Sequence, residues 1–333
     1  MAQRVQFRRL LHIVRVLTAH GVAHLVARHA RWRWLLRLVP IAELTGPRRF
    51  RRLFEDLGGS FIKFGQMLAL QPDIVTLEYS DELFNLLDRI APFDYAHVEQ
   101  VFAEELGATP AELFDTFSPE PLATASIGQV HVAQLHGRSV AVKVQRPSVD
   151  VDFMGDIRLM TFAMRLIRRF EIRSLFWTLE PMGEFVAWTR EELDYRREAR
   201  YAERLRRNAV ENAFERVPEV FWDLTTRRVM AMDYVEGVPL ETLSRLDVPQ
   251  ARRDAIGALL ERLLFRELFE FRVMQTDPNF ANYLYQPESG RIALLDFGAT
   301  KIFSTQFVAR YARITLAVIE GDLDAVAREA ANS

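Results

Sequence analysis

Three polar side chains in the C-terminal third of the chain have the types and spacing needed to bind a magnesium ion. Asp277 and Asn282 lie five positions apart in a polar segment, and Asp296 follows an apolar stretch at residues 292–295. Carboxylate and carboxamide oxygens are the hard ligands that Mg²⁺ prefers. The interval between Asn282 and Asp296 fits a pair of short strands with a turn at residues 287–290, which would bring the side chains together. The alternative is that all three only cap backbone turns.

Lys143 is a second candidate for chemistry because it ends an alternating apolar segment. The sequence Val-Ala-Val-Lys at residues 140–143 predicts a strand, so the lysine side chain emerges on a defined face. In protein kinases a lysine in this position pairs the α- and β-phosphates of ATP, and Asp-Phe-Gly at residues 296–298 resembles the kinase magnesium element. The spacing of Asp277 and Asn282 resembles that of the kinase catalytic loop. Together these patterns indicate nucleotide binding.

The segment upstream of this lysine departs from an ordinary kinase. Ala123, Thr124, Ala125 and Ser126 stand where a kinase has its glycine-rich phosphate loop. Alanine lacks the conformational freedom that lets a glycine backbone approach phosphates, and the β-branched threonine is stiffer still. We therefore expect altered handling of the nucleotide, and not loss of binding.

The helical segments expected to position these residues fall in three regions. Apolar spacing predicts helices over residues 50–118, where prolines interrupt the pattern, over residues 152–208, and over residues 250–271. The first of these regions lies before the predicted strands, and the other two lie between them.

The strands are predicted from alternation and from turn residues. Residues 127–146 alternate around His136-Gly137 and predict a β-hairpin. Two more strands with a turn near Thr225-Thr226 are expected within residues 218–236, and short strands around a polar loop are expected within residues 272–300. The order of helices and strands predicts an α+β chain with a divergent, two-lobed protein-kinase-like fold and an N-terminal helical extension. We divide the chain into four parts: residues 1–49, 50–118, 119–240 and 241–333.

Six segments, in this order along the chain, resemble the UbiB (aarF-domain) family of atypical kinases. They are LGGSFIKFGQ (57–66), ATASIGQVH (123–131), VAVKVQRP (140–147), EELDYRREA (191–199), QTDPNFANYLY (275–285) and LLDFGAT (294–300). Six ordered motifs make the resemblance specific, and it covers about residues 50–300. The Gln-Thr-Asp-Pro-Asn wording is similar to the branch that supports coenzyme Q synthesis in mitochondria and related bacteria.

The resemblance implies roles for residues that spacing alone does not single out. The family's Lys-x-Gly-Gln motif matches Lys63, Gly65 and Gln66, on a helix that covers the pocket where a protein kinase seats its peptide substrate. The family's Glu-x-Asp motif matches Glu192 and Asp194, and in the family it meets that helix.

The glutamate that partners the strand lysine in the family maps to Glu198. One helical turn would put Asp194 and Glu198 on the same face, since residues four apart are neighbours on a helix. The alternative is a charged, solvated helix, because residues 190–207 hold many other charges.

The resemblance also assigns roles around the nucleotide. Lys143, oriented by Glu198, would hold the phosphates, and Asn282 and Asp296 would hold Mg²⁺. Asp277 would orient a nucleophile, either water or a hydroxyl. A further segment is expected to meet the adenine: Asp233, Tyr234 and Val235.

The N-terminal arm, residues 1–49, is basic and amphipathic. Residues 1–52 contain twelve arginines and one acid, Glu43. This charge indicates an anionic partner, either a membrane surface or a nucleic acid, and arginine with tryptophan at helical spacing favours the membrane. The alternative is a helix that packs on its own domain. Since no stretch of about 18 uninterrupted apolar residues occurs, the sequence predicts no transmembrane helix.

These features predict an ATP- and Mg²⁺-binding ATPase or small-molecule kinase that supports ubiquinone or another quinone lipid at a membrane. Its expected partners are an anionic membrane surface and enzymes or lipid intermediates of quinone synthesis, without nucleic acid. The sequence does not decide between a monomer and a homodimer. The resemblance implies the cytoplasmic face of a bacterial inner membrane, or a mitochondrion in a eukaryote. The rival readings are a protein kinase and a non-catalytic nucleotide-binding scaffold.

Two further features bound this expectation. The absence of cysteine excludes a disulfide framework and a zinc–thiolate site. Only 35 residues follow Gly298, where family members continue through several helices, so we expect a short or truncated C-lobe.

Overall fold

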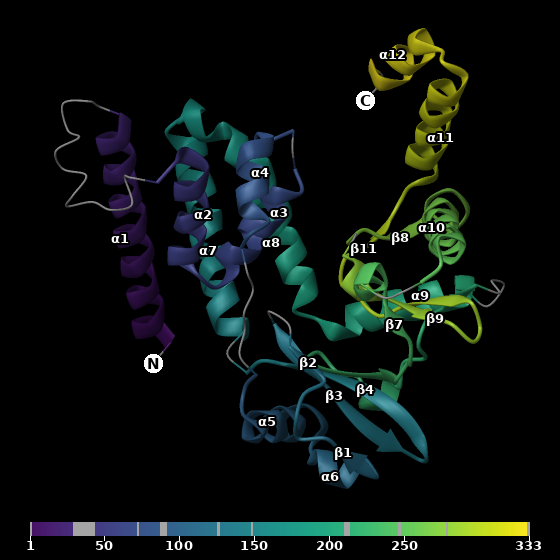
Figure 1. Cartoon of the computed structure of the whole chain (residues 1–333). Helices are drawn as coiled ribbons and strands as arrows, with labels where there is room; N and C mark the ends of the chain where they lie inside the picture. The colour runs from purple at the N-terminus through teal and green to yellow at the C-terminus, as the bar shows by residue number, and fades with distance from the viewer. Residues whose placement is uncertain are drawn as a thin grey trace. The chain divides into compact units, whose positions relative to one another are not determined.

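The computed structural model describes nine ranges of the chain: residues 2–28, 44–71, 73–86, 92–124, 127–147, 149–209, 214–245, 248–277 and 279–331. Two compact units form, and each is built from segments distant in sequence (Figure 1). The first unit comprises Met1–Asp94, Thr124–Gln129 and Gln145–Leu193, and the second comprises Tyr95–Ala123, Val130–Val144 and Asp194–Ser333. The units therefore do not follow the four predicted parts, whose boundaries stay a prediction.

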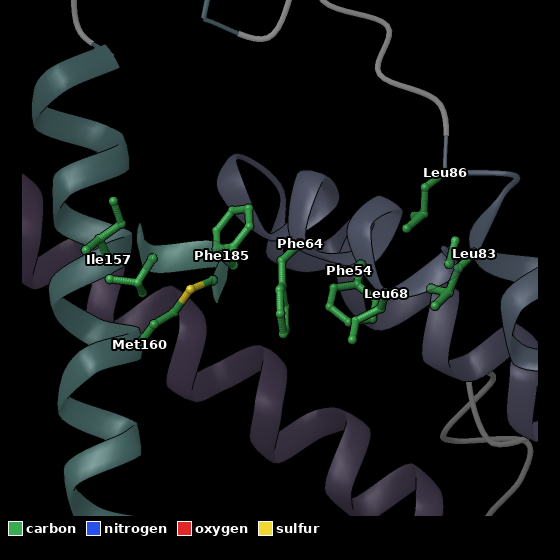
Figure 2. Packing of buried hydrophobic residues seen from close by; sticks show 10 residues of the cluster. Phe54, Phe64, Leu68, Leu83, Leu86, Ile157, Met160 and Phe185 are labelled. Atoms are coloured by element: carbon green, nitrogen blue, oxygen red, sulfur yellow. The ribbon is translucent and has the colours of Figure 1, made fainter. Parts of the chain in front are cut away.

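The first unit is built mainly from helices. They are α1 (Ala2–Arg28), α2 (Gly46–Leu57), α3 (Ser60–Ala69), α4 (Leu77–Leu83), α7 (Val149–Arg169), the 3₁₀ helix η3 (Arg173–Thr178) and α8 (Leu179–Glu192). Their shared core holds Phe54, Phe64, Leu68, Ile157 and Phe185, which come from α2, α3, α7 and α8 (Figure 2). The first two of the three helices formed within residues 152–208, α7 and α8, thus pack on the helices that precede the strands, whereas the third belongs to the second unit.

A buried carboxylate connects three helices of this unit. Asp156 of α7 accepts hydrogen bonds from Nε and Nη2 of Arg9, each at 2.8 Å, and from the hydroxyl of Ser60 at 2.6 Å. Arg9 also donates to the carbonyl oxygen of Leu57 at 2.7 Å. These bonds fix α1 and α7 to the turn that precedes α3, the helix of the Lys-x-Gly-Gln motif.

Replacing Asp156 with Asn is expected to lower the stability of the first unit by about 2 kcal/mol, because the partly buried guanidinium of Arg9 would lose its charge partner and the charge-assisted bonds at this buried position would weaken. The measurement is calorimetric unfolding of the whole chain, in which the transition of this unit moves to lower temperature. Asp73 is exposed in the same unit, so Asp73→Asn is the control. Equal shifts in the two variants would show that the Arg9–Asp156 contact contributes nothing.

Helix α1 differs from the expectation for membrane spans. Its segment Arg8–Ala27 is long and apolar enough, by length and composition, to cross a membrane, and 28% of it is buried in the structure. A core helix or a signal sequence passes the same test. One face of the helix is buried in the first unit, through Ile13, Val16 and Ala23.

The second unit contains the predicted β-hairpin. Strands β3 (Gly128–Leu135) and β4 (Arg138–Gln145) are joined by His136 and Gly137, whose φ angles of 51° and 76° are those of a tight hairpin turn. In the sheet the order is β1-β3-β4-β6, and β2 also pairs with β3. The other strands are β1 (Thr116–Phe117), β2 (Ala123–Thr124) and β6 (Val229–Asp233).

Within residues 218–236 the structure forms one strand and not two. β6 pairs antiparallel with β4, and Val220 makes only an isolated bridge to Met232. The three-residue 3₁₀ helix η4 (Trp222–Leu224) occupies the rest of the expected first strand.

The remaining elements of the second unit follow the predicted order. The helix expected at residues 250–271 forms as α10 (Gln250–Phe265), and its last turn is the π-helix η6 (Arg266–Phe271). A four-stranded sheet has the order β5-β10-β9-β7, and β8 pairs with β11. These strands are β5 (Glu215–Arg216), β7 (Val238–Pro239), β8 (Val273–Gln275), β9 (Tyr283–Gln286), β10 (Arg291–Leu294) and β11 (Thr300–Ile302).

The other helices of this unit flank the sheets in sequence. They are α5 (Tyr95–Leu106), α6 (Pro110–Leu113), α9 (Tyr195–Ala209), η5 (Leu240–Arg245), η7 (Phe280–Asn282), α11 (Thr305–Glu320) and α12 (Leu323–Ala331). Leu240, Ile256, Leu263, Tyr285 and Ile292 form a core under α10, which fixes the β9–β10 hairpin. The combination of helices and short sheets is the expected α+β class.

Candidate functional site

The β9–β10 hairpin brings Asn282 and Asp296 to one end of a sheet. Asn282 directly precedes β9, and the antiparallel register pairs Tyr283 with Leu294. One residue further along the chain, the backbone N–H of Leu295 donates to the carbonyl oxygen of Asn282 at 2.9 Å. Asp296 follows Leu295 and is therefore held beside Asn282. The strand pair inferred from the spacing of these residues is confirmed.

A side-chain hydrogen bond adds Asp277 to this group. Nδ2 of Asn282 donates to Oδ2 of Asp277 at 2.8 Å, so the carboxamide oxygen of Asn282 is the atom that remains as a cation ligand. The side chain of Gln275 accepts the backbone N–H of Asp277 at 2.6 Å, which fixes the start of the loop. The three residues form one connected set, as their spacing predicts.

Lys143 and Glu198 form an ion pair beside this set. Lys143 extends from β4 and Glu198 from the first turn of α9, and their side chains are 13% and 8% exposed. The carboxylate of Glu198 also accepts the backbone N–H of Phe297, the residue after Asp296. The lysine, its glutamate partner and the Asp-Phe-Gly segment therefore lie at one site.

The electrostatics of Glu198 reflect this crowding. Burial raises the pKa of the Glu198 carboxyl, the ammonium of Lys143 opposes the rise, and the charge of Asp296 adds to it. A second cation near Asp296 would favour the ionised form of Glu198. Binding of a metal ion and ionisation of Glu198 are thus coupled.

The donor set fits Mg²⁺ only if the nucleotide supplies further oxygens. Among the described residues there is no group of three or more His, Cys, Asp or Glu side chains able to hold a metal ion. Asp296 and Asn282 offer one carboxylate and one carboxamide oxygen, and Mg²⁺ needs six ligands, which phosphates and water commonly complete. Oδ1 of Asp296 already accepts the N–H of Gly298 at 2.8 Å, which fixes the carboxylate.

The residues expected to meet the rest of the nucleotide are only partly described. Ala123 and Thr124 form β2 and are exposed, whereas Ala125 and Ser126 lie outside the described ranges. Leu122 donates its N–H to the carbonyl oxygen of Val130, so this strand is held on the sheet that carries Lys143.

The predicted adenine segment follows β6. Asp233 and Tyr234 donate their backbone N–H groups to the carbonyl oxygens of Glu219 and Ser139, at 2.9 and 3.0 Å. The backbone N–H groups of these two residues are thus used within the sheet, and the adenine contact of the segment stays a prediction. The side chain of Asp233 pairs with Arg138 at 2.7 Å, away from such a role.

The Lys-x-Gly-Gln motif makes its contacts inside the first unit. Lys63 forms an ion pair with Glu192, and its Nζ lies 4.4 Å from the ring centroid of Trp188. Gln66 donates to the carbonyl oxygen of Leu86 at 3.0 Å. At Gly65 an added Cβ would lie 2.5 Å from the side chain of Leu86 and 3.0 Å from the ring of Phe54, so a larger residue would require these buried side chains to move.

Asp194 is placed differently from Glu192. Helix α8 ends at Glu192 and α9 begins at Tyr195, so Asp194 precedes the helix and does not share a helical face with Glu198. Its side chain accepts the backbone N–H of Arg196 at 3.1 Å. The residue acts as a cap at the start of the helix that carries Glu198, a stabilising role for a carboxylate.

One buried acid behind the catalytic loop is absent from the sequence predictions. Glu267 lies in the π-helical turn after α10, and its Oε2 accepts the backbone N–H of Gln275 at 3.0 Å. Burial raises the pKa of Glu267 to about 8, and the charge of Glu215 adds to the rise. Burial also raises the pKa of the nearby Tyr283 hydroxyl. The only signal in the sequence is an acid within a strongly apolar helix.

Stability is expected to fall as pH rises from about 5 to 8, because Glu267 binds a proton in the folded state that the unfolded chain releases near pH 4.5. The loss reaches about 4 kcal/mol at most. Glu267→Gln should flatten this pH dependence in urea unfolding measured at several pH values. Glu261→Gln, at an exposed position of α10, is the control, and the account is wrong if the two variants show the same slope.

Comparison with known proteins relates this chain to atypical kinases. The family model of the ABC1 atypical kinase-like domain matches residues 85–330. Atypical kinase COQ8B, mitochondrial, of Rattus norvegicus is 37% identical over 272 residues, which are 80% of this chain and 50% of that protein. The probable protein kinase UbiB of Cellvibrio japonicus is 34% identical over 288 residues, 84% of this chain and 52% of that protein.

A solved structure shares the fold. The complex of Rv3197 with erythromycin from Mycobacterium tuberculosis has a TM-score of 0.60 and 29% sequence identity, and the match covers 82% of this chain and 69% of that one. The chain spans about half the length of the curated relatives described above. The matched domain includes Lys143, Glu198, Asp277, Asn282 and Asp296. The chain therefore belongs to the ABC1/UbiB family of atypical kinases and has that family's kinase-like fold.

Proposed function

We propose that this chain binds ATP with Mg²⁺ and transfers the γ-phosphoryl group to water or to a small hydroxyl compound, in support of quinone-lipid synthesis at a membrane. The observation that carries the proposal is a set of contacts in two parts. The first runs from Lys143 through Glu198 to the Asp-Phe-Gly segment. The second runs from Leu295, the residue before Asp296, to Asn282 and on to Asp277. Each residue type in this set has a function in phosphoryl transfer.

The roles follow from the contacts. The ammonium of Lys143 would hold the phosphates, and the ion pair with Glu198 keeps it in place. The carboxylate of Asp277 would orient the attacking hydroxyl group. Its hydrogen bond to Asn282 would keep the residue that orients the nucleophile next to a residue that would hold the metal ion. A bound Mg²⁺ would neutralise charge on the β- and γ-phosphates. Asn282 and Asp296 would hold it.

Two features favour a small acceptor over a protein. Alanine and threonine stand in place of the glycine-rich loop, and these residues limit closure over the nucleotide. The family resemblance also gives the Lys63 helix the place of a peptide substrate. The quinone pathway is supported by that resemblance and by relatives that carry the names UbiB and COQ8B.

The test is ATP turnover by the full chain, with Mg²⁺ or EDTA, with and without anionic vesicles and a phenolic quinone precursor. We expect turnover that needs Mg²⁺ and is lost in Asp277→Asn, with the precursor or the vesicles raising it. Labelled phosphate on the precursor would indicate a small-molecule kinase, and free phosphate an ATPase. Transfer to a peptide at ordinary kinase rates would overturn the proposal in favour of a protein kinase. Nucleotide binding with no turnover under any condition would indicate a non-catalytic nucleotide-binding scaffold.

A further inference from the structure

A cavity of about 600 Å³ lies among the helices of the first unit. Helices α1, α2 and α4 contribute to its walls together with η3, and α1 and α2 run side by side (Figure 1). Cavities that bind small molecules have volumes of about 300–1,000 Å³. The volume is therefore sufficient for a ligand, and none of the residues assigned to ATP or Mg²⁺ lines it.

One face of α1 forms a wall of this cavity. Leu17, Gly21 and His24 line it, and their spacings of four and three residues place them on one side of the helix. The next positions on this side, Val14 and Leu25, are about half exposed and apolar. The cavity wall thus continues into an apolar surface of the helix segment that is long enough to cross a membrane.

The lining combines an apolar interior with basic and hydroxyl groups. Phe50, Leu53, Ile74, Val75 and Trp177 supply apolar surface. The polar groups come from three different helices and the loop before α4: His20, His24, Arg49, Thr76 and Tyr79.

The charge of the lining is one-sided. Among the described residues that line the cavity, none is acidic. Asp56 lies outside the lining and pairs with His20 at 2.9 Å, which holds that imidazole in place. Arg49 donates through Nη1 to the carbonyl oxygen of Leu44 at 2.8 Å, so its guanidinium is fixed at the wall. A fixed guanidinium beside imidazoles favours an anionic or hydrogen-bond-accepting group.

We propose that this cavity binds a long-chain anionic amphiphile, with its apolar chain among the aromatic and aliphatic residues and its anionic head at Arg49 and His24. Carboxylates and phosphate monoesters share this chemistry. The exposed apolar side of α1 provides a path from a lipid phase to the cavity. The inference goes beyond the proposed function and does not depend on it, since none of the residues assigned to ATP lines the cavity.

Gly21 offers a way to fill the cavity without disturbing the helix. A Cβ added at this glycine meets no heavy atom within 4 Å, and leucine favours a helix interior more than glycine does. Gly21→Leu should therefore fold as the wild type does and occupy part of the ligand volume. Gly257 on α10 is also free of contacts within 4 Å of an added Cβ, so Gly257→Leu is the matched control.

The experiment is titration calorimetry of the full chain with dodecanoate and dodecyl phosphate, each below its critical micelle concentration, and with dodecanol below its solubility limit. We expect saturable binding of one or both anions and at least about tenfold weaker binding of the uncharged alcohol, since one charged contact corresponds to such a factor. The anion that binds more tightly identifies the source of the head group. Gly21→Leu should raise the dissociation constant at least tenfold, and Gly257→Leu should leave it unchanged.

Two outcomes would overturn the inference. One is unchanged anion binding by Gly21→Leu, with circular dichroism confirming that the variant is folded. The other is the lack of saturable binding by the folded wild-type chain. Equal affinity for dodecanol and the anions would contradict the assignment of the head group to Arg49 and His24.

Discussion

Replacing Asp296 with Asn is expected to reduce ATP turnover at least about a hundredfold while the chain stays folded. The carboxylate is the one negatively charged oxygen ligand that the site offers beside Asn282, and losing it removes several kcal/mol of charge stabilisation. A factor of one hundred needs only about 2.7 kcal/mol. Asparagine keeps an oxygen that can accept the N–H of Gly298, now at 2.8 Å, so the local backbone should be retained.

The control for this variant is Asp254→Asn. Asp254 is exposed on α10 and accepts a hydrogen bond from Gln250 at 2.7 Å, far in sequence from the hairpin. Its turnover should equal that of the wild type, and thermal unfolding of both variants should match. If Asp296→Asn keeps full turnover, the hydrolysis comes from a contaminant or from another site.

Replacing Lys143 with Ala is expected to lower stability by about 3 kcal/mol at pH 8 and to abolish ATP binding. The substitution leaves Glu198 buried without its ammonium partner, and removing one member of a buried pair commonly costs 3–5 kcal/mol. Burial already raises the pKa of Glu198, so without Lys143 the carboxyl should bind a proton in the folded state. The variant should therefore lose stability as pH rises, and urea unfolding at pH 5 and pH 8 measures the difference.

Two further variants complete this experiment. Lys143→Ala/Glu198→Gln removes the buried charge and should regain part of the stability at pH 8, without regaining ATP binding. Lys301→Ala, at an exposed position of β11, should match the wild type in both respects. The ion pair would be irrelevant to folding if Lys143→Ala unfolded like the Lys301 variant at both pH values.

The sequence predicts the site best where the structure depends on contacts between residues that are close in sequence. The hairpin at residues 127–146 follows from strict alternation and a glycine turn, and the hairpin before Asp296 follows from a short interval with turn residues. These two units of local structure carry Lys143, Asn282 and Asp296. Their positions could be predicted because the same few residues determine both the turn and the register.

Other features depend on contacts between distant segments, which a single sequence does not show. A continuous helical pattern hides the break at Leu193 and Asp194, where the chain passes from one compact unit to the other. The buried acid Glu267 accepts a hydrogen bond from Gln275, 8 residues further along the chain. Arg9 and Asp156 pair across 147 residues. The apolar content of α1 is also divided by arginine and histidine, so a search for uninterrupted apolar runs overlooks it.

The most direct test of the account is equilibrium binding of a non-hydrolysable ATP analogue to the wild-type chain, with Mg²⁺ and with EDTA. We expect binding that depends on Mg²⁺, and at least about tenfold weaker binding by Asp296→Asn, because this residue and Asn282 would supply the protein's metal ligands. Binding of equal strength with and without Mg²⁺, unchanged by Asp296→Asn, would contradict the central claim that these residues form a Mg²⁺–ATP site.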